Sequence, residues 1–343
     1  MHICLLRLSA LGDVCNAIPL MRRLQDNLSS VTLTWVIGEK EASLVSDIEN
    51  VELIRYRKSG GWRALREQLT GRYFDVLLLL QPTMRAHLAS LLINADRRIG
   101  CDGIHAREGH RWFVNETVSS PDQAHVMESF LVFSNAMGVM NPTSIRWDIP
   151  ISAPAHAMAA YYIPPGHPVL IVSPCASESK KIHRNWPVER YIEVIEFVIE
   201  RLGWQVILTG SGHPTERHYE NMILKQSRFK PVSLIGQTSV KELLALLSRA
   251  KAVLCPDSSP AHLAAAVNTS VIGLYAATNP RRSGPPPYAR QWIVDRYEDS
   301  LKHFTGKSPD QVSWGAKVHH PRAMELIAVE EVIDVLTRLA LKA

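Results

Sequence analysis

The chain has 343 residues, of which 46% are hydrophobic and 21% are charged, and its net charge is +5 at pH 7. This apolar content excludes an intrinsically disordered chain, and no run of the sequence approaches the roughly 20 consecutive apolar residues of a membrane-spanning helix. The small excess of Lys and Arg does not by itself indicate nucleic-acid binding, but it suits an anionic ligand or an anionic membrane surface.

In the first part of the chain, short apolar runs alternate with segments of helical periodicity. This pattern predicts strands at residues 3–8, 33–37, 53–56 and 76–80. It predicts helices after the first strand as far as residue 28 and at residues 62–69, 87–94 and 126–137. The strand at 76–80 is wholly apolar, as expected for a parallel strand buried on both faces. Because Pro19 lies inside the first helical segment, this helix is expected to kink or to begin late.

A proline-rich segment interrupts the alternation at residues 141–168. Its six prolines cannot continue a helix or a central strand, so the predicted domains are 1–160 and 161–343. The second domain has predicted strands at 169–172, 205–209, 232–235, 252–255 and 271–274, and helices at 188–201, 215–226, 240–249, 261–267 and about 324–341. The last helix is a candidate to pack back on the first domain. Two successive strand–helix arrays predict an α/β fold with two Rossmann-like, doubly wound domains that face a central cleft.

Ligands of doubly wound sheets bind beyond the carboxyl ends of the strands, so the loops after the strands carry the candidate site. The first of these loops is Arg7-Leu8-Ser9-Ala10-Leu11-Gly12-Asp13. Gly12 would let the backbone turn tightly beside a ligand, and the Asp13 carboxylate would act as a general base. The alternative is that Asp13 only caps the helix that follows.

A second loop, Pro256-Asp257-Ser258-Ser259-Pro260-Ala261-His262, opens a helix whose free N–H groups suit a phosphate. Asp257 would accept hydrogen bonds from sugar hydroxyls, and His262 would reach a diphosphate or a sugar oxygen. The alternative is an ordinary helix cap followed by a histidine of the core.

Two further loops of the second domain combine features that suit a nucleotide. Residues 173–187 hold hydroxyls and three cations that would neutralise two phosphate charges without a metal, unless this is merely a solvated basic loop. The residues concerned are Ser177, Lys180, Lys181 and Arg184. In the loop that begins at Gly210, Glu216 would bond a ribose hydroxyl, but a glutamate is equally common in the first turn of a helix.

A basic segment of the first domain, with Arg57, Lys58 and Arg63, would meet an anionic acceptor together with Arg85, or else form a solvated face. P-loop, HExxH, GxSxG and GxGxxG motifs are absent, as are a DxD pair and any Cys/His metal-ligand spacing. We therefore expect no metal or other cofactor. The five scattered cysteines favour a reduced, cytoplasmic protein.

Taken together, these loops resemble those of glycosyltransferase family 9, the ADP-heptose–lipopolysaccharide heptosyltransferases. The resemblance extends in order over essentially the whole chain and includes the loop from Arg7 to Val14, residues 173–186, the segment from Pro256 to Ala266 and the segment Val271-Ile272-Gly273-Leu274-Tyr275-Ala276-Ala277-Thr278-Asn279-Pro280. Residues 34–38 and 107–109 look closest to the branch that adds the first heptose to a Kdo residue, including a phosphorylated Kdo.

The resemblance implies a GT-B fold and inverting, metal-independent transfer of heptose from ADP-heptose to Kdo of the lipopolysaccharide inner core. It implies that Asp13 is the catalytic base, that Arg184 stands where relatives carry a diphosphate-binding lysine, and that Asp257, Ser258 and His262 match the donor-binding motif. The implied partners are ADP-heptose and Kdo-lipid A, with no nucleic acid. The implied location is the cytoplasm, in peripheral contact with the inner membrane.

Two departures from the family pattern affect these expectations. Ser259 stands where the motif usually has glycine, so a requirement for positive φ would strain Ser259 or remodel the loop. The loop from Ser177 to Arg184 is longer than in some relatives, so Lys180, Lys181 and Arg184 compete for the phosphate role. The alternatives are a GT-B glycosyltransferase or epimerase that uses another nucleotide sugar, and a non-catalytic sugar-nucleotide-binding protein.

Overall fold

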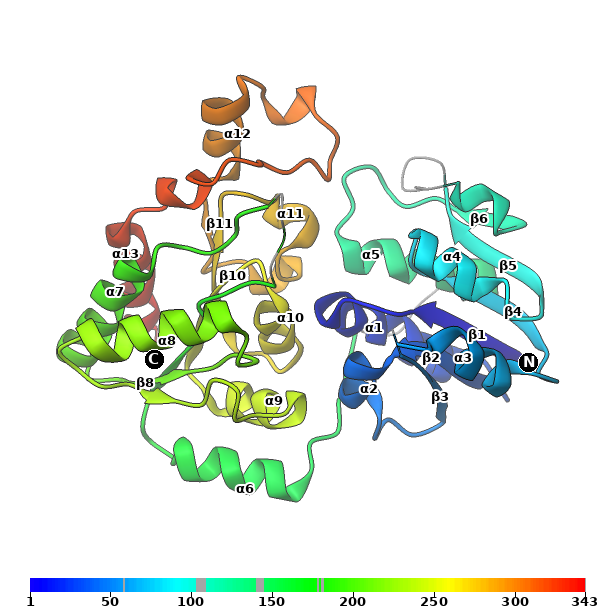
Figure 1. Cartoon of the computed structure of the whole chain (residues 1–343), viewed down its shortest axis with the longest axis horizontal. Helices are drawn as coiled ribbons and strands as arrows, with labels where there is room; N and C mark the ends of the chain where they lie inside the picture. Colours follow the sequence, from blue (N-terminus) through cyan, green and yellow to red (C-terminus); the bar gives the residue numbers. More distant parts are fainter. Residues whose placement is uncertain (58, 103–108, 140–144, 178, 180–181, 343) are drawn as a thin grey trace. The chain divides into compact units, whose positions relative to one another are not determined.

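The computed structural model describes residues 1–57, 59–102, 109–139, 145–177, 179 and 182–342 (Figure 1). The chain divides into two compact units, Met1–Pro150 and Ile151–Ala343. Each unit is a parallel sheet of six strands flanked by helices. In the described part of the chain, no helix is long and apolar enough to span a membrane.

The first unit has the strand order β3-β2-β1-β4-β5-β6, with every pair parallel. Its strands are β1 (His2–Arg7), β2 (Thr32–Gly38), β3 (Val51–Tyr56), β4 (Phe74–Leu79), β5 (Ala95–Cys101) and β6 (Glu116–Val118). Its helices are α1 (Leu11–Asn27), α2 (Glu39–Val45), α3 (Gly61–Leu69), α4 (Met84–Ser90) and α5 (Val126–Leu131), with 3-10 helices η1 (His110–Trp112) and η2 (Val132–Met137). The central strands β1 and β4 are largely buried, which explains the apolar runs Ile3–Leu6 and Val76–Leu79 within them.

The second unit has the order β9-β8-β7-β10-β11-β12, again all parallel. Its strands are β7 (Val169–Val172), β8 (Gln205–Leu208), β9 (Val232–Ser233), β10 (Ala252–Pro256), β11 (Ser270–Tyr275) and β12 (Val294–Asp295). Its helices are α6 (Ala153–Tyr162), α7 (Val188–Arg201), α8 (Pro214–Gln226), α9 (Val240–Arg249), α10 (Ser259–Ala266), α11 (Pro280–Ser283), α12 (Tyr297–Thr305) and α13 (Val329–Leu341). Its short 3-10 helices are η3 (Pro287–Ala289), η4 (Pro309–Gln311) and η5 (Ala323–Leu326).

Both units therefore share one topology, in which the chain runs outward to one edge, returns to the centre and continues to the other edge. The direction reverses between β1 and β4 in the first unit and between β7 and β10 in the second. At such a point the loops after the two central strands diverge and leave a crevice, which is where doubly wound folds bind ligands. The fold class predicted from the sequence, two Rossmann-like domains, is confirmed.

Helix α1 does not begin late, because it runs from Leu11 to Asn27 with Pro19 in its interior, and the predicted kink stays a prediction. Proline cannot donate a hydrogen bond to the carbonyl four residues earlier, which here is that of Cys15. The indole Nε1 of Trp147 donates to that carbonyl at 2.9 Å instead.

The proline-rich segment also contains a helix that the sequence pattern did not predict. In α6, Pro154 occupies the first turn, where proline is tolerated, and the hydroxyl of Ser152 accepts a hydrogen bond from the amide of Ala155. This helix packs against α9, and Arg249 Nε donates to the carbonyl of Ile163 at 2.9 Å. Accordingly α6 belongs to the second unit, which begins at Ile151.

The last helix, α13, places its apolar face in the core of the second unit. Its buried residues include Val332 and Leu336, which join the cluster built around Trp186 and Tyr191. The indole of Trp186 donates to the carbonyl of Ile327, just before α13 begins, at 3.0 Å. This helix is therefore part of the domain in which its sequence lies.

Candidate active site

In the first unit, the loops that follow β1 and β4 are joined by side chains at the point where the strand order reverses. Arg7, the last residue of β1, is buried and donates from Nη1 to the carbonyl of Leu80 at 2.8 Å. In return, Gln81 Oε1 accepts hydrogen bonds from the amides of Leu8 and Ser9, at 2.8 and 3.3 Å. These bonds fix the backbone that leads into α1.

Asp13 lies in the first turn of α1, and its side chain is 36% exposed. Its carboxylate forms an ion pair with the guanidinium of Arg7 and lies 3.5 Å from the amide nitrogen of Ala10. Asp13 thus has the position of a helix cap, which was the alternative reading, and it is also held by a buried arginine. Arg7 in turn lies over the ring of Phe130, 5.2 Å from the centroid. An accessible carboxylate in a fixed orientation is what a general base requires.

In the second unit, Arg184 joins the loops that follow β7 and β10. Its Nη1 donates to the carbonyl of Asp257 at 2.9 Å, and its Nη2 donates to the carbonyl and the hydroxyl of Ser177 at 2.9 and 3.1 Å. The carboxylate of Asp257, itself buried, lies 3.9 Å from Nη1 and accepts a 3.5 Å hydrogen bond from Ser283. Three residues of the predicted donor site therefore meet around one guanidinium.

The guanidinium of Arg184 also has an unused donor. Its Nε is buried and has no hydrogen-bond partner among the described residues. Since a buried charged donor without a partner is costly, this atom indicates an anionic or polar ligand at the same place. Lys180 and Lys181, which compete with Arg184 for the phosphate role, lie outside the described residues.

Ser258 and Ser259 lie at the N-terminus of α10. Ser258 is the cap residue, but its hydroxyl donates to the carbonyl of Pro256 at 3.1 Å rather than capping the helix. The Ser258 side chain does not cap this helix, Pro260 has no N–H, and the Ala261 amide donates to the carbonyl of Ser258 at 3.2 Å, so the Ser259 amide is the first-turn donor left for a ligand. Ser259 is already helical, so the φ is negative and neither strain nor a remodelled loop follows from the loss of glycine. His262 is buried one turn further on.

Glu216 caps α8, which matches the simpler of its two readings. Its carboxylate Oε2 accepts hydrogen bonds from the hydroxyl of Ser211 at 2.7 Å and from the amide of His213 at 2.9 Å. It lies after β8, the neighbour of β7, so it is on the same edge of the sheet as Arg184. The role of Glu216 toward a ribose stays a prediction.

The basic residues predicted to meet the acceptor are spread over three elements. Arg57 follows β3 and pairs with Glu39, with 3.2 Å from Nε to Oε2, while Arg63 on α3 pairs with Glu67 at 3.0 Å. Arg85 is exposed on α4. Lys58 lies outside the described residues. Two of these cations are therefore already neighbours of a carboxylate, which reduces the positive potential that they create.

No group of three or more His, Cys, Asp or Glu side chains arranged to hold a metal ion occurs among the residues that the structure describes. The positive charge at the candidate diphosphate site is that of Arg184, and the same loop also carries Lys180 and Lys181. The expectation that no cofactor is required stays a prediction.

Comparison with known proteins places this fold and these loops in a family. A family model described as glycosyltransferase family 9 (heptosyltransferase) matches residues 62–311. The chain belongs to this family. It is 35% identical over 342 residues to the lipopolysaccharide core heptosyltransferase OpsX of Haemophilus influenzae, covering 99% of this chain and 97% of that protein. The protein is therefore an enzyme, a glycosyltransferase of the heptosyltransferase type.

Solved structures agree on the fold. A family 9 glycosyltransferase from Veillonella parvula superposes with a TM-score of 0.79 at 19% identity, covering 100% of this chain and 97% of the other. The Escherichia coli heptosyltransferase WaaC, solved with ADP, gives a TM-score of 0.75 at 19% identity, covering 99% of this chain and all of that one. These likenesses confirm the GT-B class predicted for the chain.

Arg7 and Gln81 are two residues of this site whose roles were not predicted from the sequence. The signal for Arg7 was present, because a charged residue ends an otherwise apolar and buried strand. A buried arginine requires acceptors, and here they are the Leu80 carbonyl and the Asp13 carboxylate. Gln81 carried no comparable signal, since its role depends on the pairing of β4 with β1.

Proposed function

We propose that the chain transfers L-glycero-D-manno-heptose from ADP-heptose to a Kdo residue of the lipopolysaccharide inner core, with inversion at the anomeric carbon. The observation that carries the proposal is the Asp13 carboxylate, accessible and paired with buried Arg7 beyond the end of β1. The name of the OpsX relative, a lipopolysaccharide core heptosyltransferase, supports the choice of substrates.

In the proposed reaction, a Kdo hydroxyl attacks the anomeric carbon of heptose while Asp13 accepts the hydroxyl proton. A new C–O bond forms as the bond between the anomeric carbon and the diphosphate oxygen breaks, and ADP leaves with the electron pair. Direct displacement places the new bond on the face opposite the leaving group, so the configuration inverts. Arg7 orients the Asp13 carboxylate before the proton moves.

The second unit would bind the donor. Arg184, with the free Nε described above, and the uncapped N-terminus of α10 are positioned to stabilise the charge that develops on the diphosphate. Lys180 and Lys181 belong to the same loop and would add to this charge. Asp257, just before α10, and His262, on α10, would contact the heptose or the diphosphate. Protein cations and helix amides then replace a metal ion, and the reaction is proposed to be metal-independent.

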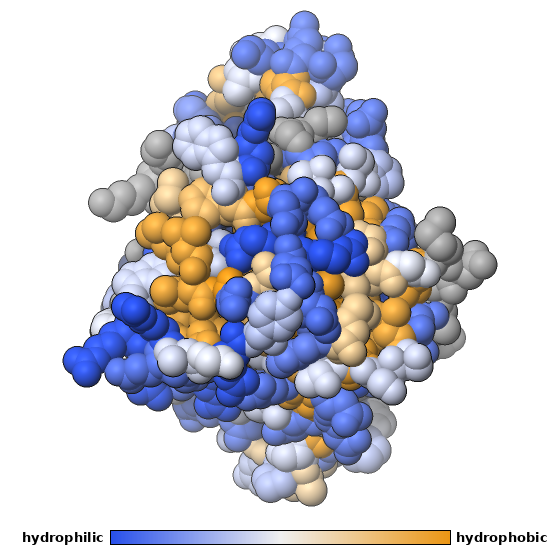
Figure 2. All heavy atoms as spheres, turned by 90° about the vertical axis from the view of Figure 1, so that its right-hand side faces the viewer, coloured by the Kyte–Doolittle hydropathy of each residue, from blue (hydrophilic) through white to orange (hydrophobic). Residues whose placement is uncertain are grey.

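The acceptor is an anionic glycolipid, so we further propose peripheral contact with the cytoplasmic face of the inner membrane. Figure 2, which views the molecule from the right-hand side of Figure 1, shows apolar patches bordered by strongly hydrophilic surface. In the first unit, Met84, Leu88 and Leu91 recur at helical spacing on α4 and at its end, and they are 47%, 45% and 63% exposed. Exposed Arg85 lies on the same helix, a combination that suits an anionic bilayer.

The test is transfer of labelled heptose from ADP-heptose to Kdo-lipid A, with the stereochemistry of the product determined by NMR. The expected result is an α-linked product from the β-configured donor. In the Asp13→Asn variant, turnover should fall by about 10²–10⁴-fold while the affinity for ADP is retained. Release of free heptose or an epimer without acceptor would favour the epimerase alternative. Binding of ADP-heptose without any turnover would favour a non-catalytic protein.

Membrane contact has its own test. Vesicles that contain anionic lipid should co-sediment with the wild-type chain, and a Leu88→Ser/Leu91→Ser variant should bind them more weakly. The control is a variant with two serine substitutions on the exposed face of α3, Ala64→Ser/Gln68→Ser, since these positions are exposed but carry no large apolar side chain. Equal binding by all three proteins would contradict the proposed contact surface.

A further inference from the structure

Helix α1 carries Asp13 in its first turn and a proline in its interior. In an α-helix the amide of residue 19 would donate to the carbonyl of residue 15, but Pro19 has no amide hydrogen. The ring of an interior proline also crowds the carbonyl four residues before it. The turn that contains Asp13 and Cys15 is therefore joined to the rest of the helix by one backbone hydrogen bond fewer than usual.

A side chain from the far end of the first unit supplies a donor at this position. Trp147 Nε1 donates to the carbonyl of Cys15 at 2.9 Å, across 132 positions of the sequence. The bond is buried, and Trp147 is only 6% exposed. The indole N–H therefore makes, from outside the helix, the contact that an ordinary residue at position 19 would make from within it.

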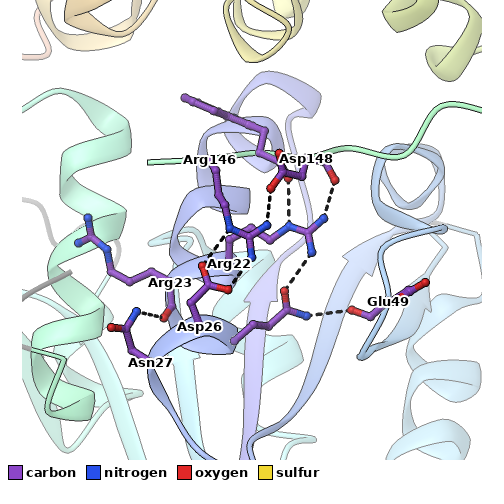
Figure 3. Close-up of polar contacts among 9 residues, drawn as sticks. Arg22, Arg23, Asp26, Asn27, Glu49, Arg146 and Asp148 are labelled. Carbon is purple, nitrogen blue, oxygen red and sulfur yellow. Dashed lines mark hydrogen bonds and ion pairs between the residues drawn. The ribbon is translucent and has the colours of Figure 1, made fainter. Parts of the chain in front are cut away.

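The segment around Trp147 is fastened to α1 on the other side of the proline. Arg22 Nε donates to the carbonyl of Trp147 at 3.0 Å, and Arg22 Nη2 donates to the carbonyl of Asp148. Arg146 Nε donates to Asp26 Oδ2 at 2.9 Å and also binds the carboxylate of Asp148 (Figure 3). The hydrogen bonds from Arg146 lower the pKa of Asp26, so this carboxylate is charged at neutral pH.

These contacts lie on both sides of Pro19. Cys15 precedes the proline by one turn, whereas Arg22 and Asp26 follow it. The Arg146-Trp147-Asp148 segment thus spans the position where the helix lacks its own hydrogen bond. A contact on one side alone would fix only half of the helix.

We propose that Trp147 is a positioning residue for catalysis, whose indole N–H replaces the hydrogen bond that Pro19 cannot make and so holds the first turn of α1, with Asp13, in its active orientation. The inference rests on the proposed role of Asp13 as the base. It concerns orientation, because Trp147 has no described contact with the Asp13 side chain. A small tilt of the first turn would move the carboxylate relative to Arg7 and to the acceptor hydroxyl, which is costly for a reaction that depends on alignment.

The test is a cycle of two substitutions. Trp147→Phe keeps an aromatic ring in the buried site but removes the N–H donor together with part of the indole, whereas Pro19→Ala restores a backbone amide that can reach the Cys15 carbonyl and so tests the hydrogen bond separately from the lost volume. Trp147→Phe should lower kcat by about five- to tenfold and leave the KM for ADP-heptose within about twofold, because the donor residues lie in the second unit. Pro19→Ala alone should leave kcat within about twofold of wild type.

The decisive protein is the double variant Pro19→Ala/Trp147→Phe. If the indole acts through its hydrogen bond, the new amide replaces it and kcat should return to within about twofold of Pro19→Ala. An equal loss from Trp147→Phe with and without Pro19→Ala would overturn the proposal, because the indole would then act by packing. A wild-type kcat for Trp147→Phe would overturn it too, as would failure to fold of both proteins that carry Trp147→Phe.

A matched control is Trp292→Phe. Trp292 is also buried, but its indole N–H has no acceptor among the described residues, so its loss should leave kcat unchanged. Asp13→Asn, assayed in parallel, separates the two proposals. If Asp13→Asn retains turnover, the proposed base is wrong. If Asp13→Asn abolishes turnover while the double variant shows no rescue, only the role of Trp147 is wrong.

Discussion

An arginine links the two central loops in each unit: buried Arg7 in the first and partly buried Arg184 in the second. Arg7 ends β1 and reaches the loop after β4, and Arg184 follows β7 and reaches the loop after β10. Each crosses the point where the strand order of its sheet reverses, and each uses backbone carbonyls as acceptors. In the proposed reaction, the remaining part of the guanidinium would orient Asp13 in one unit and offer the unpartnered Nε to the donor in the other.

Arg7→Lys should lower kcat although it keeps the charge. Lysine has one ammonium group and cannot bind the Leu80 carbonyl and the Asp13 carboxylate in the fork geometry of arginine. We expect a loss of about tenfold or more in kcat, with little change in ADP affinity, measured by steady-state transfer and calorimetry. Arg338→Lys, at an exposed ion pair with Asp334 on α13, is the control and should behave as wild type. Equal activity of the two variants would show that Arg7 does not orient the base.

Arg184→Ala should weaken ADP binding by about 1.5–3 kcal/mol, the range for a hydrogen bond to a charged group. The loss should be this large because Arg184 also holds Ser177 and the Asp257 backbone in place. Calorimetry with ADP and no acceptor measures the effect directly. Lys180→Ala and Lys181→Ala are the comparison, and a larger loss from either than from Arg184→Ala would assign the phosphate role to that lysine.

At the scale of elements, the sequence predicted strands best where both faces are buried. The strands β1, β4 and β7 are each built on an apolar run of four residues or more, and their positions were predicted closely. The strand β5 was missed because its sequence, Ala95–Cys101, includes Asp96, Arg97 and Arg98. The structure shows why charge is tolerated there, since Arg97 pairs with Glu116 on β6 and Arg98 donates to carbonyls of α4 and its following loop.

The residues of the candidate site were likewise predictable only where the local sequence indicates them. Asp13, Asp257 and Arg184 were predicted because each lies in a loop directly after an apolar strand, which the sequence displays locally. The contact of Arg184 with Asp257 joins residues 73 positions apart, and that of Trp147 with Cys15 spans 132 positions. Hydrophobic periodicity is a local property of the sequence and cannot predict contacts between residues so far apart. The late start considered for α1 on the basis of Pro19 is therefore wrong, and the indole that donates in place of the missing amide could not be predicted because it is distant in the sequence.

The contact between α4 and η1 predicts a loss of stability in acid. His87 Nε2 and His110 Nδ1 are 2.9 Å apart, both side chains are buried, and His87 stacks on Phe113. Burial, and secondarily the neighbouring His87, lower the pKa of His110 to about 4. In the unfolded chain a histidine titrates near 6.5, so between about pH 6.5 and 4 the unfolded state binds more protons than the folded state. The free energy of unfolding should therefore fall as the pH falls through this window.

Urea unfolding at pH 7.5, 6 and 5 measures this dependence. In His110→Gln, which has no ring to protonate, the fall should be smaller than in wild type, although stability at pH 7.5 will also be lower because the contact with His87 is altered. His156→Gln is the control, since His156 is exposed on α6 and its removal should leave the pH dependence unchanged. The same pH dependence in all three proteins would show that His110 does not carry it.

At the scale of the whole molecule, the two units repeat one strand order, and each carries its own candidate residues at the point where its strand order reverses. The described contacts of Arg7 and Asp13 lie within the first unit, and those of Arg184 and Asp257 within the second. This division explains why substitutions of the base should affect turnover, whereas substitutions of the donor loops should affect nucleotide affinity.

We expect heptose transfer to continue when divalent metal ions are removed by a chelator. The described residues contain no cluster suited to a metal ion, while Arg184 and the start of α10 supply positive charge and N–H donors where the diphosphate would bind. Transfer in excess EDTA should stay within about twofold of the untreated rate. Because the phosphates of a lipid acceptor themselves bind divalent cations, the affinity for ADP alone is the cleaner measurement. The affinity for ADP should be the same in EDTA and in Mg²⁺. If EDTA abolished both ADP binding and transfer, and Mg²⁺ or Mn²⁺ restored them, the diphosphate would be bound by a metal ion and not by the cationic loop.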